Sequence, residues 1–125
     1  MERQKRAARY QSLFQDLLPS MPDLGLPKIQ YENRHIFNQY VIRVPQRDEL
    51  KQFLLRGGIG TDIYYPLPLH LQECYAFLKH RQGDLPVSER ACEETLALPI
   101  YPELTEEQQG RVVDQIKAFY RKKID

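Results

Sequence analysis

The chain has 125 residues, of which 18 are Lys or Arg and 17 are Asp or Glu, so its formal net charge is +1. That length suits one domain, and the balanced charge argues against a dedicated nucleic-acid or membrane-surface binder, because such proteins carry a clear basic excess. No apolar run approaches the roughly 20 residues of a spanning helix, and the charged start MERQKRAARY is no secretory signal, so cytoplasmic residence is expected. The two cysteines, Cys74 and Cys92, form no CxxC pair and are expected to be reduced thiols.

The first half of the chain predicts two helices, at residues 2–18 and 46–56, and a strand at residues 35–44 between them. The apolar residues of the first helix recur on one face: Ala7, Tyr10, Phe14 and Leu17. A proline-rich loop over residues 19–34, with a short extended piece at 29–31, separates this helix from the β-branched and aromatic strand. Gly57 and Gly58 are expected to end the second helix, because glycine takes the left-handed conformation cheaply.

The second half predicts three helices and two extended segments: a strand at 59–65, helices at 70–78, at 86–96 and from Thr105 to about residue 122, and an extended exit at 98–102. Pro86 suits the first turn of a helix, and Thr105 with Gln108 forms a capping box. This order of elements predicts an α+β fold in which a small, mostly antiparallel sheet has helices on one face. Because the strands are few, we expect something outside the chain to complete or cover the sheet.

Most patterns that could carry chemistry favour a structural interpretation. The GxxG string at residues 57–60 is expected to precede a strand, which favours a helix cap and turn over a phosphate or RNA contact. His70 and Cys74, four apart with His80 nearby, lack the further ligands of a metal site. The basic clusters at 3–9 and 121–123 are expected to be solvated helix faces. The residues themselves predict no catalytic, cofactor-binding or metal-binding group.

The densest feature is residues 61–72, TDIYYPLPLHLQ, in which two tyrosines, two prolines and a histidine follow a strand. Tyrosine hydroxyls and an imidazole at a strand end can donate to sugar hydroxyls or phosphate, and prolines hold such a loop rigid. The alternative is a proline-rich turn whose tyrosines pack at the surface. Residue types alone favour that turn.

Four blocks in order resemble one known family. The string GIGTDIYYPLPLHLQECY, preceded by HIFNQYVIRV and followed by GDLPVSERACEETLALPIYPELTEEQ, resembles the small C-terminal domain of the DegT/DnrJ/StrS sugar aminotransferases. ERQKRAARY resembles the helix that links their two domains, which divides the chain into an interdomain-type helix at 1–18 and a C-terminal small domain at 19–125. The resemblance implies the small-domain fold of fold-type I aminotransferases. It also implies transfer of an amino group from glutamate to a keto sugar nucleotide, with pyridoxal phosphate as cofactor.

The resemblance also implies what this chain lacks. In that family a lysine of the large N-terminal domain binds the cofactor, and no lysine here lies in a matching motif. We therefore expect the chain to be part of such an enzyme, not catalytic alone and holding no pyridoxal phosphate by itself. The implied partners are the large domain, a nucleotide sugar and a second copy in a homodimer, with no nucleic acid and no membrane.

Residue by residue, the resemblance implicates His35, Tyr64, Tyr65 and His70 as substrate-binding residues. The Tyr-Tyr-Pro-Leu-Pro-Leu-His form is most similar to members that act on 3-oxo sugar nucleotides. The rival hypothesis is a free-standing binding or regulatory module that reuses the fold. An RNA-binding α/β domain is disfavoured, because the strands lack the Lys/Arg-Gly-Phe-x-Phe pattern of a stacking sheet.

The first helix yields one expectation about assembly. In the family this helix packs between two domains, so its apolar stripe is expected to be exposed here and to drive self-association. The alternative is that the helix folds back onto the sheet.

Overall fold

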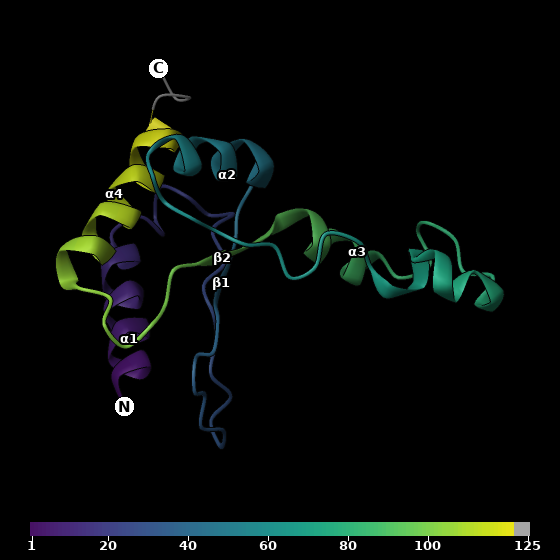
Figure 1. Cartoon of the computed structure of the whole chain (residues 1–125), viewed down its shortest axis with the longest axis horizontal. Coiled ribbons are helices and arrows are strands. Elements are labelled where there is room, and N and C mark those ends of the chain that lie inside the picture. Colours follow the sequence, from purple (N-terminus) through teal and green to yellow (C-terminus); the bar gives the residue numbers. More distant parts are fainter. Residues whose placement is uncertain (122–125) are drawn as a thin grey trace.

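The computed structural model describes residues 1–121, and its architecture is α+β (Figure 1). Its elements in chain order are α1 (Glu2–Gln15), β1 (Tyr40–Arg43), α2 (Arg47–Arg56), the 3-10 helices η1 (Leu69–Leu71) and η2 (Glu73–Leu78), α3 (Pro86–Glu94), β2 (Thr95–Leu98) and α4 (Glu106–Arg121). We call α1, α2, α4 and the sheet the body, and residues 64–94 the arm. Figure 1 shows the arm projecting away from the body on the side opposite α1 and α4. The α+β class and the small antiparallel sheet are confirmed.

The sheet is smaller than the sequence predicts. β1 and β2 pair antiparallel, with Tyr40 opposite Leu98, and the predicted strand at 59–65 contributes a single bridge between Asp62 and Ala97. The predicted strand at 35–44 shrinks to four residues because Phe37 takes a left-handed conformation, with φ of 51°. Its N–H donates to Nδ1 of His35 at 2.9 Å, so this donor is used locally and not in a ladder.

The second half of the chain departs from prediction at two places. The helix predicted to run to residue 96 ends at Glu94. The strand β2 follows at residues 95–98, whereas the sequence predicted an extended segment at residues 98–102. The predicted helix at 70–78 is a pair of 3-10 turns, since little of it is covered by the body. The capping box is confirmed, because the Gln108 N–H donates to Oγ1 of Thr105 at 3.2 Å. The predicted end of the last helix, at residue 122, lies outside the described residues.

Gly58 ends α2 as expected. Its φ is +77°, a conformation that glycine adopts without a Cβ penalty, and its N–H donates to the Leu55 carbonyl at 2.9 Å. The GxxG string is therefore a helix cap and turn.

The expectation of an exposed stripe on α1 is wrong. Tyr10 and Phe14 are completely buried within the chain, and Ala7 and Leu17 are no more than 7% exposed. The helix packs on α4, the Tyr10 hydroxyl donates to the Pro99 carbonyl at 2.9 Å, and buried Gln109 donates to the Arg6 carbonyl at 2.8 Å. Folding back buries apolar side chains worth about 1.5–3 kcal/mol each, so α1 belongs to the core of the body and its stripe gives no reason for self-association.

Candidate functional site

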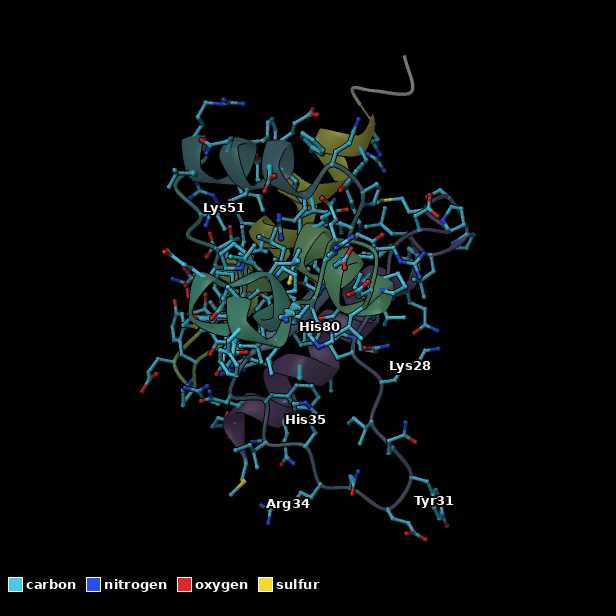
Figure 2. The ribbon with its side chains drawn as sticks, turned by 90° about the vertical axis from the view of Figure 1, so that its right-hand side faces the viewer. Lys28, Tyr31, Arg34, His35, Lys51 and His80 are labelled. Carbon is cyan, nitrogen blue, oxygen red and sulfur yellow. The ribbon has the colours of Figure 1, made fainter. Side chains whose placement is uncertain are left out.

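A groove of about 850 Å³ lies between α1 and the loop of residues 27–37. Its floor on α1 is lined by Gln4, Ala7, Ala8 and Gln11, and its wall by Pro27, Lys28, Ile29, Asn33, Arg34, His35 and Phe37. The two alanines leave the space that the groove occupies. Figure 2 shows Lys28, Tyr31, Arg34 and His35 along this loop, which stands clear of the body.

Four side-chain hydrogen bonds hold this end of the loop to Met1 and the first turn of α1, one of them from Arg3 to the Phe37 carbonyl at 3.3 Å. Gln4 donates to the His35 carbonyl at 2.9 Å, and Arg3 donates to the Asn38 carbonyl at 2.8 Å. From the other direction, the Arg34 guanidinium donates to the Met1 sulfur at 2.8 Å. These contacts fix the end of the loop that carries His35, so the groove has a defined wall.

His35, the first predicted site residue, lies exposed at this wall. Its ring stacks on buried Phe37 with 4.0 Å between centroids, and its Nδ1 accepts the Phe37 N–H. A neutral imidazole whose Nδ1 is an acceptor carries its hydrogen on Nε2. The structure therefore presents the Nε2–H of His35 as a hydrogen-bond donor, in an orientation set by the left-handed turn at Phe37.

Tyr64, the second predicted residue, lines a separate pocket of about 180 Å³ with Asn38, Gln39 and Asp62. Its hydroxyl donates to Oδ2 of Asp62 at 3.3 Å, and the negative charge of that carboxylate raises the pKa of Tyr64. Thr61 also lines this pocket, and its buried Oγ1 has no hydrogen-bond partner among the described residues. The pocket thus holds a protonated phenol, a carboxylate and an unsatisfied hydroxyl, all of which suit a polar ligand.

Tyr65 and His70 lie on the arm. Tyr65 is 71% exposed beside Tyr64, with the two rings edge-on at 6.0 Å, while His70 is buried. His70 Nε2 lies 2.8 Å from Oε1 of Glu89, and that carboxylate also accepts the Gly83 N–H at 2.9 Å. The Gly83 hydrogen bond first, and His70 second, hold the pKa of Glu89 below its usual range. His70 thus holds the arm together, and neither it nor Tyr65 lines the groove or the Tyr64 pocket.

The lysines of the described residues do not fit pyridoxal phosphate. A Schiff-base lysine needs an amine desolvated or tuned toward neutrality. Lys5 pairs with Glu2 at 2.7 Å, Lys51 donates to the Thr61 carbonyl at 2.8 Å, and Lys117 lies half-buried on α4. The remaining described lysines, at positions 28 and 79, are exposed, and those at 122 and 123 lie outside the described residues.

Two other findings concern residues 1–121. No group of three or more His, Cys, Asp or Glu side chains is placed to hold a metal ion there, and both cysteines are free thiols. Within the same residues, no helix combines the length and apolar character that crossing a membrane requires.

Sequence reasoning missed the cationic wall of the groove. It treated residues 19–34 only as a proline-rich loop, and did not single out Lys28, Asn33 or Arg34. The available signal was the polar and basic string KIQYENRH directly before Ile36. That string becomes a wall only because Gln4 and Arg3 of a distant helix hold it, and such pairing has no sequence signature.

The chain matches a known protein family over most of its length. The profile of the DegT/DnrJ/EryC1/StrS aminotransferase family matches residues 1–117. A protein of Geobacillus stearothermophilus named pleiotropic regulatory protein is 48% identical over 96% of this chain and 32% of its own length. The dTDP-3-amino-3,4,6-trideoxy-alpha-D-glucose transaminase of Micromonospora megalomicea is 39% identical over 89% of this chain and 30% of its own length. The chain thus spans about a third of these relatives.

Solved structures also align with nearly the whole of this chain, and with less than a third of their own length. S. venezuelae DesV, crystallised with a ketimine intermediate, aligns with a TM-score of 0.85 and 34% identity over 94% of this chain and 31% of its own. NtdA of Bacillus subtilis, with bound cofactor PMP, aligns with a TM-score of 0.79 and 27% identity over 94% of this chain and 27% of its own. Because these alignments cover nearly the whole chain, this fold recurs within larger proteins.

Proposed function

Because the chain belongs to the DegT/DnrJ/EryC1/StrS aminotransferase family, we propose that it forms the small C-terminal domain of an enzyme that aminates a keto sugar nucleotide with glutamate as the amino donor. One observation carries this proposal. The family profile covers residues 1–117, while the chain accounts for only about a third of a named sugar-nucleotide transaminase. The cofactor lysine would then lie in residues outside this sequence, in agreement with the poor fit of the described lysines.

In this proposal the chain binds and orients the sugar nucleotide. His35 offers an Nε2–H donor, Tyr64 a hydroxyl beside Asp62, and Tyr65 an exposed amphipathic ring. His70 acts indirectly, because its bond to Glu89 sets the shape of the arm that carries Tyr65. The name of the Micromonospora relative, a 3-amino sugar transaminase, supports a 3-oxo sugar as the acceptor.

The proposal also assigns the parts of the whole enzyme. Residues 1–18 are the interdomain helix and residues 19–125 the small domain, although α1 shares the core of the body. Pyridoxal phosphate is held by the absent large domain, and two copies form a cytoplasmic homodimer. No step of the amino transfer is assigned to a side chain of this chain.

A second candidate function is a regulatory module. The observation that favours it is the name of the 48% identical Geobacillus relative, a pleiotropic regulatory protein. The two functions differ in whether the chain can serve in amino transfer when it is joined to a cofactor-binding domain.

A chimera tests the proposed function. The last third of the Micromonospora transaminase is replaced by this chain, and 2-oxoglutarate formation from glutamate and the keto sugar nucleotide is measured. We expect turnover, with a raised KM for the sugar nucleotide when His35→Ala is introduced. A chimera that folds by circular dichroism and binds the cofactor, yet gives no turnover, would contradict the proposal and favour the regulatory module. The parent transaminase serves as the positive control.

A further inference from the structure

The exposed apolar surface of this chain is concentrated on the arm. Within residues 1–121, fifteen large apolar side chains are exposed, and nine of them belong to the arm, which has 31 of the 125 residues. The nine are Tyr64, Tyr65, Leu67, Leu69, Tyr75, Phe77, Leu78, Leu85 and Val87. Phe77 is 72% exposed and Val87 is 77% exposed. Soluble proteins rarely leave much contiguous apolar surface in water, so a concentration of this kind marks an interaction surface.

The arm keeps its shape through polar contacts and not through these side chains. The Glu89 carboxylate accepts the Gly83 N–H at 2.9 Å, and it also lies 2.8 Å from Nε2 of buried His70. In the turn between η2 and α3, Oδ2 of Asp84 accepts the Arg81 N–H at 2.8 Å. These contacts connect η1, the turn and α3, so the apolar side chains stand on a preformed surface. Such a surface loses little conformational entropy when a partner covers it.

Both passages between the body and the arm are held by α2. Buried Arg47 donates to the carbonyls of Cys92 at 2.8 Å and Thr95 at 2.7 Å, where the chain leaves the arm. One turn further along α2, Lys51 donates to the Thr61 carbonyl at 2.8 Å, just before the arm begins (Figure 2). Because one helix holds both passages, the arm has a set direction, away from α1 and α4 (Figure 1).

The arm recurs in a longer protein. S. venezuelae DesV aligns over 94% of this chain with a TM-score of 0.85, so most of the arm lies within the aligned part. The alignment covers only 31% of DesV itself. Within residues 1–121 the body leaves the arm uncovered, whereas such a protein has about two thirds of its own length available to cover it.

We propose that the arm is the surface on which the large domain of the enzyme docks, with apolar side chains of that domain covering Phe77 and Val87. The identity of the partner rests on the proposed function, which places the large domain in the same polypeptide. A covalent link makes docking an intramolecular step at a high effective concentration, which favours the large domain over a second copy of this chain. The arm thereby takes the role expected of the apolar stripe on α1, which is buried inside the body.

Hydroxyl-radical labelling read by mass spectrometry tests this docking. The isolated chain and the chimera are labelled at low micromolar concentration, and the oxidation rates of Phe77, Leu78 and Val87 are compared. We expect these rates to be at least about threefold lower in the chimera, and the rate of Leu55, which is exposed on α2, to change less than about twofold. Equal rates for the arm residues in the two proteins would overturn the proposal. Protection in the isolated chain that grows with its concentration would also overturn it, because the occupant would then be a second copy.

The intact Geobacillus relative allows the same test without a chimera, because it aligns with 96% of this chain. Its peptides that align with residues 64–94 are expected to label at least about threefold more slowly than the arm of the isolated chain, after correction for the intrinsic reactivity of each side-chain type. Labelling as fast as in the isolated chain would contradict docking on the arm.

A matched pair of double variants in the chimera locates the contact. Phe77→Ser with Val87→Ser removes two exposed apolar side chains from the arm, and Ile36→Ser with Leu55→Ser removes two exposed ones elsewhere. We expect the arm variant to raise the labelling rate of Leu78 at least about threefold, and the matched variant to change it less than about twofold. The same rate of Leu78 in both variants would exclude docking through Phe77 and Val87.

Labelling and turnover separate this proposal from the proposed function. If the chimera turns over while its arm labels as fast as in the isolated chain, the docking proposal fails and the proposed function stands. If the chimera folds and binds the cofactor with a protected arm but gives no turnover, the docking proposal stands and the proposed function fails.

Discussion

The body and the arm of this chain differ in how far they bury their apolar side chains. The body joins α1, α2, α4 and the sheet through one apolar core, in which side chains such as Tyr10, Leu50 and Ile116 are completely buried. Of the arm residues 64–94, all of which the structure describes, only Pro68 and His70 are buried. The arm exposes large apolar side chains instead, among them Phe77 and Val87. The body is therefore held by apolar packing, and the arm mainly by polar contacts, among them the one between His70 and Glu89.

Substitution in the core of the body has the largest expected effect. Phe14→Ala removes a completely buried ring from the face of α1 that meets the core, and should cost about 3–5 kcal/mol of unfolding free energy. Urea denaturation followed by circular dichroism measures this value. Phe77→Ala, which truncates the same side chain on the arm, is the matched control. A loss below about 1 kcal/mol for Phe14→Ala would mean that α1 is not part of the core.

The junction of body and arm comes next. Buried Arg47 at the start of α2 donates to the carbonyls of Cys92 at 2.8 Å and Thr95 at 2.7 Å, and so caps α3 where it meets β2. Arg47→Met leaves these carbonyls without their donor and should cost about 1–3 kcal/mol. Urea denaturation measures the cost, and amide hydrogen exchange should show faster exchange in α3 than in α4. Arg56→Met, at an exposed arginine of the same helix, serves as the control, and an equal loss there would exclude the capping role.

Acid should loosen the arm before the body. The pKa of Glu89 is depressed, so its contribution to stability is present above the ordinary glutamate value of 4.5 and is lost as the pH falls through the lower folded value. Amide exchange in residues 83–94 should accelerate over this acidic range while the body remains protected. Glu89→Gln should remove that pH dependence, and Glu93→Gln, at an exposed position on α3, should retain it. Exchange in the arm that is independent of pH in the wild-type chain would contradict this account.

The contrast between body and arm also explains which predictions from sequence succeeded. Helices with a buried apolar stripe or a clear end signal, such as α4 with its Thr105 capping box and α2 with Gly58, were predicted nearly to the residue. Within the arm, α3 was also predicted to within two residues. The part before it was predicted poorly, since residues 69–78 form 3-10 turns in which buried His70 contacts Glu89, 19 residues away. No local periodicity encodes such a contact.

The candidate site likewise contains residues that the sequence indicated and residues that it did not. His35 and Tyr64 came from a family resemblance, and the structure places both beside pockets with free donors or acceptors. The roles of all four predicted residues stay predictions. The polar string that holds Lys28 and Arg34 was visible in the sequence, but its place in a groove was not, because a cation in a loop becomes part of a groove only when a distant helix packs beside it. The positive φ at Phe37, which orients His35, likewise has no sequence signal at a phenylalanine.

The smallest expected effect concerns the exposed apolar surface of the arm. Phe77 is 72% exposed, so Phe77→Ser removes little buried area and should change the unfolding free energy by less than about 0.5 kcal/mol. The same polar substitution at a core phenylalanine, Phe119→Ser, loses a buried ring and leaves a hydroxyl in an apolar environment, and should be far more costly. Urea denaturation of the two variants, measured side by side, tests whether the arm contributes to the fold of the body. A loss above about 1 kcal/mol for Phe77→Ser would show that the arm packs in solution against a surface of this chain, and the division into body and arm would then have to be redrawn.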